Sequence, residues 1–203
     1  MPPTSHAPLS VSLESHKYVL CSAVQLSYIA AHDAQCAARI VSMGAIPSIV
    51  DMMSAEDGRG DDDLRFDMKE VAIKCIYNLC VSNPGNQGPI AERGAVPPLI
   101  NILVEPDHQP SIKEAAAGAI SKLAGNGVAQ DAIVESRGVD ALVGAFRAPA
   151  ATDAVKRYVK VALRLLAVHP GAKKAMLELG ILQKREQDPF KRTDSDDPFP
   201  GLS

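Results

Sequence analysis

The sequence predicts an all-α protein built as a solenoid of three to four similar helical units. Aromatic residues make up only 4% of the chain and Trp is absent, so a core drawn from its 46% hydrophobic residues consists of Ala, Leu, Ile and Val. Such a core suits close-packed helices better than a sandwich or barrel. A sequence motif also recurs: GAIPSIVDMM at Gly44, GAVPPLINIL at Gly94, GVDALVGAFR at Gly138 and a shorter GILQ at Gly180. Recurrence at 40 to 50 residues is typical of a stacked array.

A long helix is predicted before each of these motifs. The four segments are residues 17–31, 68–82, 112–126 and 155–169. In the second segment, Val71, Cys75, Ile76 and Leu79 recur at spacings of one to four residues, which forms the wide apolar stripe of a helix packed on both flanks. Consecutive alanines at 115–117 allow neighbouring helices to approach closely.

Each unit continues with a short helix, a glycine turn and a second short helix. Gly44 and Gly94 permit the sharp corner between the two short helices, because glycine adopts backbone angles that other residues avoid. Pro47 and Pro97 then fall in the first turn of the following helix, where a missing N–H costs nothing.

The stretch IYNLCVSNPGNQGPIAERGAVPPLINIL resembles an armadillo repeat, in which an A-x-x-x-L-x-N-L helix precedes G-A-I-P-x-L-V-x-L-L. The resemblance spans about Tyr18 to Leu182. It is strong in the second unit, good in the first and third, and degraded in the fourth, where LGILQ lacks the Pro. HEAT repeats are structurally related, but the GAIP corner favours armadillo. The resemblance implies a right-handed, catenin-like α-solenoid, with Gly-to-Gly spacings of 50, 44 and 42 residues.

Composition divides the chain into a repeat domain and two tails. We expect an extended Pro-rich tail over residues 1–12, the armadillo-like domain over 13–182, and a polar tail over 183–203. Residues 54–64 form an acidic insertion within the domain. Asp61, Asp62 and Asp63 lack the ligand alternation and closing Glu of an EF-hand, so we interpret this insertion as a solvated loop and expect no metal site there.

Charge and hydropathy narrow the classes of partner. A net charge of −3 gives no general reason to expect nucleic acid. No stretch approaches the roughly 18 apolar residues of a membrane span, and the first residues lack the pattern of a secretory leader. Because none of the four cysteines forms a C-x-x-C pair, we expect reduced thiols and a cytoplasmic protein. Analogy with small armadillo subunits adds a cytoskeletal or ciliary association to this expectation.

The sequence offers no convincing catalytic constellation. The five histidines are scattered, and His32 and Cys36, four residues apart, supply only two of the ligands that zinc needs. The AGNGVAQ stretch lacks the Lys and the strand of a phosphate loop, and no Gly-x-Ser-x-Gly elbow occurs. We therefore expect no enzymatic activity, no cofactor, no metal and no small-molecule substrate.

The armadillo resemblance implies a concave groove lined by the long helices, with equivalent positions forming ladders. One predicted ladder is Tyr28, Asn78, Lys122 and Arg164, and the second is Val24, Lys74, Gly118 and Lys160, with Lys156 and Arg157 alongside. Importin-like recognition of basic peptides uses Trp and Asn ladders, whereas this chain has no Trp and only one ladder Asn. The cations instead favour an extended acidic partner segment. The alternative is that they only keep a helix face soluble.

The C-terminal tail contains a short motif twice. The sequence DPF occurs at Asp188–Phe190 and at Asp197–Phe199, and such tripeptides resemble ligands of clathrin-adaptor appendage domains. Two alternatives remain: the acidic DSDDPF segment folds back over the basic groove, or Phe190 and Phe199 cap the open end of the array.

These observations predict a non-catalytic protein-interaction module or scaffold that binds an extended acidic segment. The alternative is an integral structural subunit of a large cytoskeletal or ciliary assembly, because a short stack leaves apolar surface at its ends. An endocytic adaptor ligand acting through the tail is the third hypothesis.

Overall fold

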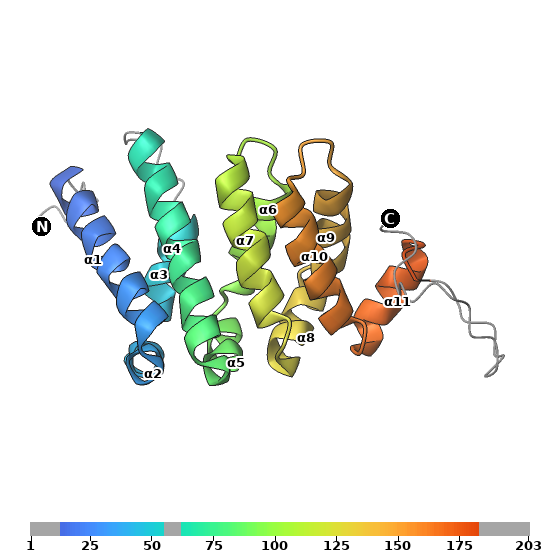
Figure 1. Cartoon of the computed structure of the whole chain (residues 1–203), viewed down its shortest axis with the longest axis horizontal. Coiled ribbons are helices and arrows are strands. Elements are labelled where there is room, and N and C mark those ends of the chain that lie inside the picture. Colours follow the sequence, from blue (N-terminus) through green and yellow to red (C-terminus); the bar gives the residue numbers. More distant parts are fainter. Residues whose placement is uncertain (1–12, 55–61, 183–203) are drawn as a thin grey trace, which may run out of the picture.

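The computed structural model describes residues 13–54 and 62–182, and within these ranges it contains helices and no strands (Figure 1). This confirms the predicted all-α class. The α-helices are α1 (Leu13–His32), α2 (Ala34–Ser42), α3 (Ile46–Ser54), α4 (Asp62–Ser82), α5 (Gln87–Glu92), α6 (Val96–Val104), α7 (Pro110–Leu123), α8 (Gly127–Glu135), α9 (Gly138–Arg147), α10 (Asp153–Leu166) and α11 (Pro170–Glu178). A short 3₁₀ turn, η1 (Pro84–Asn86), precedes α5.

The helices stack into the repeating unit expected from the sequence. The long helices α1, α4, α7 and α10 lie side by side, and each packs against the next (Figure 1). Helices α3, α6 and α9 lie behind them, and α2, α5 and α8 lie along the lower edge of the view, with α11 continuing the array beyond α10. The chain therefore forms a right-handed solenoid of long helix, short helix, corner and short helix.

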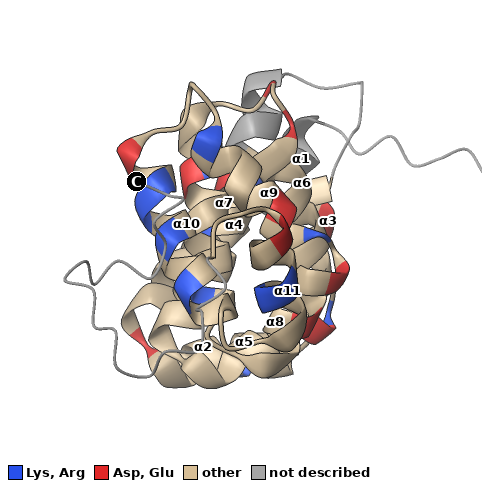
Figure 2. Ribbon diagram, turned by 90° about the vertical axis from the view of Figure 1, so that its right-hand side faces the viewer, with Lys and Arg blue, Asp and Glu red and all other residues tan. Residues whose placement is uncertain are grey.

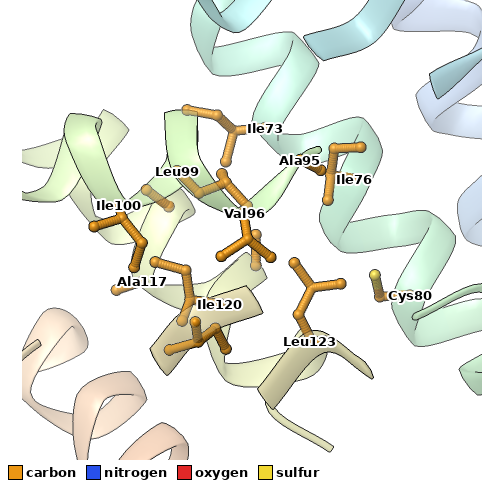
Figure 3. Packing of buried hydrophobic residues seen from close by; sticks show 14 of the residues in the cluster. Ile73, Ile76, Cys80, Ala95, Val96, Leu99, Ile100, Ala117, Ile120 and Leu123 are labelled. Atoms are coloured by element: carbon orange, nitrogen blue, oxygen red, sulfur yellow. The ribbon is translucent and has the colours of Figure 1, made fainter. Parts of the chain in front are cut away.

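One continuous apolar core runs through the array. In its central part, Ile73 and Ile76 of α4, Leu99 of α6, and Ile120 and Leu123 of α7 are fully buried and meet between the three helices (Figure 3). Ala116, Ala117 and Ala119 are also fully buried, which lets α7 lie close to both of its long neighbours. The core of one unit is thus completed by helices of the neighbouring units, since α4 packs against α3 and α7, and α6 packs against α7.

A capping residue after every long helix starts the next short helix. The side chains of Asp33, Asn83, Asn126 and His169 each accept a hydrogen bond from a backbone N–H two or three residues later. In the first of these, Asp33 Oδ1 lies 2.7 Å from the amide nitrogen of Gln35. Such side chains satisfy N–H groups that a helix start leaves without partners. The four caps define equivalent positions independently of the glycines.

The third corner differs from the prediction. Gly44, Gly94 and Gly180 have φ values of 83°, 80° and 69°, but in the third unit the left-handed residue is Arg137, with φ 54°. The sequence alignment placed that corner at Gly138, one residue too late, because it assumed that glycine occupies every left-handed position. With Arg137 in register, 43 residues separate Gly94 from Arg137, and another 43 separate Arg137 from Gly180. The last three corners are evenly spaced.

Gly138 has a different role from the corner glycines. A Cβ added there would lie 2.6 Å from Ile133 Cγ2 and 2.7 Å from the backbone oxygen of Ile133. Gly138 is buried at the start of α9, so it is needed for close packing between α8 and α9, not for a left-handed backbone.

The predicted insertion and tails fall largely outside the described residues. Helix α3 ends at Ser54 and α4 begins at Asp62, so two of the acidic residues assigned to the insertion, Asp62 and Asp63, belong to the first turn of α4. Residues 55–61 of the insertion, both tails and the two DPF motifs lie outside the described ranges.

Exchanging the left-handed residues gives a stability test of the corrected register. We expect Gly94→Ala to lower the free energy of unfolding by about 1 kcal/mol, since a Cβ is disfavoured in the left-handed region, although it would contact nothing within 4 Å. Arg137→Gly relieves the same strain and should be neutral or stabilising by up to about 1 kcal/mol. Urea unfolding measures both. A loss of 1 kcal/mol or so in Arg137→Gly would contradict the assignment of Arg137 to the corner.

A pair of Gly→Ala substitutions tests the packing role of Gly138. We expect Gly138→Ala to destabilise the protein by at least about 2 kcal/mol, because its Cβ overlaps a backbone atom. The control is Gly144→Ala, also within α9, where a Cβ meets nothing within 4 Å and better helix propensity should add roughly 0.5–1 kcal/mol. Thermal unfolding should therefore move in opposite directions, and similar shifts would contradict this account.

Candidate functional site

The long helices share one exposed surface, which we call the long-helix face: the side of α1, α4, α7 and α10 that points away from α3, α6 and α9 (Figure 1). Helical geometry assigns residues to it. On α10 the buried stripe consists of Val155, Val159, Ala162, Leu163 and Leu166. At 100° per residue, Arg157, Val161 and Arg164 lie opposite this stripe, and all three are exposed.

Gly118 lies at the centre of this face, between two tyrosines. A Cβ added to Gly118 would lie 3.5 Å from the ring of Tyr77 on α4 and 3.5 Å from the ring of Tyr158 on α10. Both tyrosines are half-buried, whereas Gly118 and Ser121 of α7 are buried. Because these two positions carry small side chains, rings from both neighbouring helices extend over α7. The three long helices are thereby joined by an aromatic surface.

Two predicted lysines lie beside this aromatic surface, in different electrostatic settings. Lys122 Nζ lies 5.7 Å from the centroid of the Tyr77 ring, within the range of a cation–π interaction. Lys74 Nζ lies 2.5 Å from Glu70 Oε1 one turn earlier on α4. Glu70 was missing from the predicted ladders, and its carboxylate offsets the charge of Lys74. The positive charge therefore shifts toward α7 and α10.

The predicted Asn ladder position has an internal partner. Asn78 Nδ2 donates to Ser27 Oγ at 3.0 Å and to the Ser27 carbonyl oxygen at 3.2 Å. The hydroxyl of Ser82 also donates to the carbonyl oxygen of Ala30. Asn78 thus helps to join α4 to α1. Tyr28, the other predicted residue at this end, is 68% exposed and packs against the ring of His32, with centroids 4.5 Å apart.

Lys160 lies apart from the other predicted cations. Its Nζ is 5.6 Å from the centroid of the Phe146 ring on α9. The buried positions of α7 recur 43 residues later in α10, which aligns Lys160 with the buried Ala117 and aligns Gly118 with Val161. Ala117 is fully buried, whereas Lys160 at the equivalent position is half-buried. Lys156, one turn earlier on α10, is likewise half-buried.

Charge is distributed unevenly around the array. Seen from the α10–α11 end, Lys and Arg recur along α10 on the left, whereas Asp and Glu appear mainly on the right, around α3 and α8 (Figure 2). Arg157 and Arg164 are exposed on α10, and neither forms an ion pair with another residue of the described ranges. Exposed cations on the long-helix face are therefore concentrated near its C-terminal half.

The thiols and histidines do not form a reactive centre in the described part of the chain. Burial raises the pKa of Cys75 and of Cys80 to about 12, which keeps both thiols protonated at neutral pH. A side-chain hydrogen bond with Asp33 raises the pKa of the partly exposed Cys36. Within residues 13–54 and 62–182, no three His, Cys, Asp or Glu residues gather as metal ligands.

His169 is instead engaged in structure. Its Nδ1 accepts a hydrogen bond from the amide of Ala172, and its Nε2 lies 2.8 Å from Asp131 Oδ1. The pair joins α8 to the start of α11. Among the described helices, none alone has the length and hydropathy of a membrane span, although α2 and α3, which meet at a bend of 81°, satisfy that criterion as a pair.

Comparison with known proteins identifies the fold. No protein-family model and no curated protein matches the sequence. A designed armadillo repeat protein in complex with the peptide (KR)4 superimposes with a TM-score of 0.69 at 20% identity, covering 86% of this chain and 67% of that chain. Computationally designed armadillo repeat proteins for modular peptide recognition give a TM-score of 0.70 at 19% identity, covering 86% and 68%. The armadillo-repeats-only protein of Plasmodium falciparum gives 0.60 at 18%, covering 75% and 62%.

This chain has an armadillo-repeat fold. The resemblance stated from the sequence is confirmed at the level of structure, since three separate armadillo proteins share the arrangement of helices. In this armadillo array the long helices carry the candidate surface, because it holds the aromatic residues and most of the exposed cations described above.

The sequence-based ladders missed the aromatic part of the site. Tyr77 and Tyr158 were overlooked because the ladders were extended from the Asn position alone. A usable signal was present: a glycine at the centre of a long helix, with a tyrosine on each neighbouring long helix. The one-residue register shift of the third corner explains the remaining difference. It places Ala117 and Ser121, in place of Gly118 and Lys122, in line with Lys74 and Asn78, whereas Lys160 and Arg164 keep their predicted alignment.

Two alanine substitutions on α10 should distinguish a lysine that contributes to stability from an exposed arginine that does not. Lys160→Ala removes the cover over Phe146, so we expect it to lower the free energy of unfolding by about 0.5–1.5 kcal/mol. Arg157→Ala, in the same helix and exposed without a partner, should change stability by less than about 0.5 kcal/mol. Chemical unfolding of both variants provides the measurement, and equal losses would contradict this division.

Proposed function

We propose that the protein is a non-catalytic interaction scaffold that binds an extended, acidic protein segment along its long-helix face. The observation that carries this proposal is the surface around Gly118, where the rings of Tyr77 from α4 and Tyr158 from α10 each lie beside α7, 3.5 Å from the position of a Gly118 Cβ. Flat aromatic groups supply contact area at little conformational cost and are common energetic centres of protein interfaces. An extended chain crossing the long helices would contact all three helices there.

The charge around this centre supports an acidic partner. Lys122 lies over the Tyr77 ring, and Arg157 and Arg164 are exposed on α10, the helix that carries Tyr158, whereas the charge of Lys74 is offset by Glu70. Exposed ion pairs contribute only about 0.2–1 kcal/mol each, so they set preference and association rate more than affinity. Apolar anchors must supply the remainder, and Val161, 45% exposed, lies between the two arginines.

The fold relatives allow a sharp comparison of partners. One designed armadillo protein is in complex with the basic peptide (KR)4. The cations of α7 and α10 favour the opposite charge here, because like charges across an interface are repulsive. We therefore propose that this basic surface binds acidic segments in preference to basic ones such as (KR)4.

A second candidate function is an integral subunit of a larger assembly, including a cytoskeletal or ciliary one. It is favoured by exposed apolar residues near the end of α10: Leu165 is 38% exposed and Val168 is 80% exposed. Apolar residues at the end of a repeat array are normally covered by a cap or another subunit. Such a subunit would depend on its assembly for solubility, whereas a peptide-binding scaffold would not.

Fluorescence anisotropy with two octapeptides of opposite charge tests the proposal. We expect labelled (DE)4 to bind the full chain more tightly than (KR)4, with an affinity that falls as salt rises, because the attraction is screened. Lys122→Glu, Arg157→Glu and Arg164→Glu combined should weaken (DE)4 at least ~10-fold, since each exchange replaces an attraction by a repulsion.

The matched control is the combination Arg39→Glu, Arg147→Glu and Lys173→Glu. These three cations are exposed on α2, α9 and α11, so the net charge changes equally without altering the long-helix face. Binding of (DE)4 should fall far less in this control. Equal loss in both combinations, or tighter binding of (KR)4 than of (DE)4 by the wild-type chain, would rule out the proposed surface.

A further inference from the structure

The long-helix face contains an unpaired arginine couple on α10. Arg157 and Arg164 are seven residues apart, so their positions lie on the same side of the helix about 10.5 Å apart along its axis. Both are exposed, and neither has an ion-pair partner within the described ranges. Val161 lies between them and is 45% exposed. This spacing of charge, apolar group and charge points to a short extended ligand with two carboxylates.

We propose that the occupant is a segment of the same chain: the acidic stretch DSDDPF at residues 194–199, which docks on Arg157, Val161 and Arg164 and competes with the external partner. This segment lies outside the described residues, and its sequence is the basis of the proposal. The inference rests on the proposed function, because it names a regulator of the same surface.

The spacing of the carboxylates fits the spacing of the arginines. Asp194 and Asp197 are three residues apart. In a polyproline II conformation, residues three apart lie on the same side of the chain at about 9.3 Å, close to the axial spacing of the two arginine positions on α10. Pro198 supports this conformation, since a proline restricts the residue before it to extended angles. Two carboxylates can then face two arginines at once, and Phe199 adds an apolar group.

The chain that joins the segment to the array is long enough. Twelve residue steps separate Leu182, the last described residue, from Asp194. At most about 3.3–3.6 Å per residue, this linker spans up to roughly 40 Å. Helix α10 has 14 residues and is therefore about 21 Å long. Helix α11, which lies between α10 and Leu182, has 9 residues, so the two helices together are about 35 Å long, less than the full extent of the linker.

Tethering makes a weak contact effective. A short flexible linker holds its end at an effective concentration of the order of millimolar. Ion pairs of this kind are individually weak, but a segment with a dissociation constant below the effective concentration would occupy the site most of the time. The tail then weakens external acidic ligands without abolishing their binding, and salt weakens both contacts together.

Full-length variants with a synthetic tail peptide test this proposal. The probe is a labelled peptide of residues 190–203, and the variant combines Asp194→Asn, Asp196→Asn and Asp197→Asn in the full chain. We expect the peptide to bind this variant roughly 3- to 10-fold more tightly than the wild-type chain, because the tethered competitor is weakened. Adding Arg157→Glu and Arg164→Glu should remove the gain.

A control peptide isolates the spacing. Exchanging Asp194 and Ser195 within the peptide keeps its composition and charge but removes the three-residue interval between carboxylates. Weaker binding of this peptide supports the proposal. Equal binding of the two peptides, equal affinity of the peptide for the wild-type and neutralised chains, or no effect of the arginine substitutions would overturn it. A tail docked on a second copy instead gives a concentration-dependent increase in mass, which also overturns it.

The two peptides distinguish failure of the tail contact from failure of the proposed function. If (DE)4 binds the long-helix face but the tail peptide does not, the tail contact fails and the scaffold proposal stands. If neither (DE)4 nor the tail peptide responds to Arg157→Glu and Arg164→Glu, both fail.

Discussion

Each unit of this array buries its apolar stripe only by packing against the next unit, and this dependence turns all four long helices the same way. The capping residues after the long helices and the left-handed corners between the short helices keep the units in register. The sides of the long helices that point away from the core then form one surface, and no further interaction is needed to align them. The long-helix face is thus a consequence of core packing, and its chemistry depends on the few positions that packing leaves exposed.

Small residues decide the shape of that surface at its centre. Gly118 is buried beside tyrosine rings from both neighbouring helices, so α7 contributes backbone at this point and its neighbours contribute rings. A larger residue at 118 would push the rings apart and separate α4 from α10 at this point. Gly138 likewise leaves no room for a side chain, because α8 and α9 approach closely there. The candidate surface and the packing of the short helices therefore both depend on positions where the residue is glycine.

Much of the fold follows from periodicity in the sequence, because the apolar stripes of the long helices and the repeated corner are local patterns. The third corner was misplaced because Arg137 adopts angles usually taken by glycine, and only the path of the backbone reveals this. The site was less predictable. Lys74 was recognised, but its pairing with Glu70 and the contacts of Tyr77 and Tyr158 across α7 depend on how neighbouring helices lean. Lys160 and Asn78 have internal partners that residue type alone does not disclose.

The central claim is that one continuous surface on α4, α7 and α10 binds an extended acidic segment. Backbone amide chemical shifts recorded during titration with (DE)4 test it most directly, because they locate the contact on every helix at once. We predict perturbations that form a connected patch around Gly118, Lys122, Arg157 and Arg164 and decline with added salt. Perturbations confined to α3, α6 and α9, or to the edge formed by α2, α5 and α8, would contradict the account.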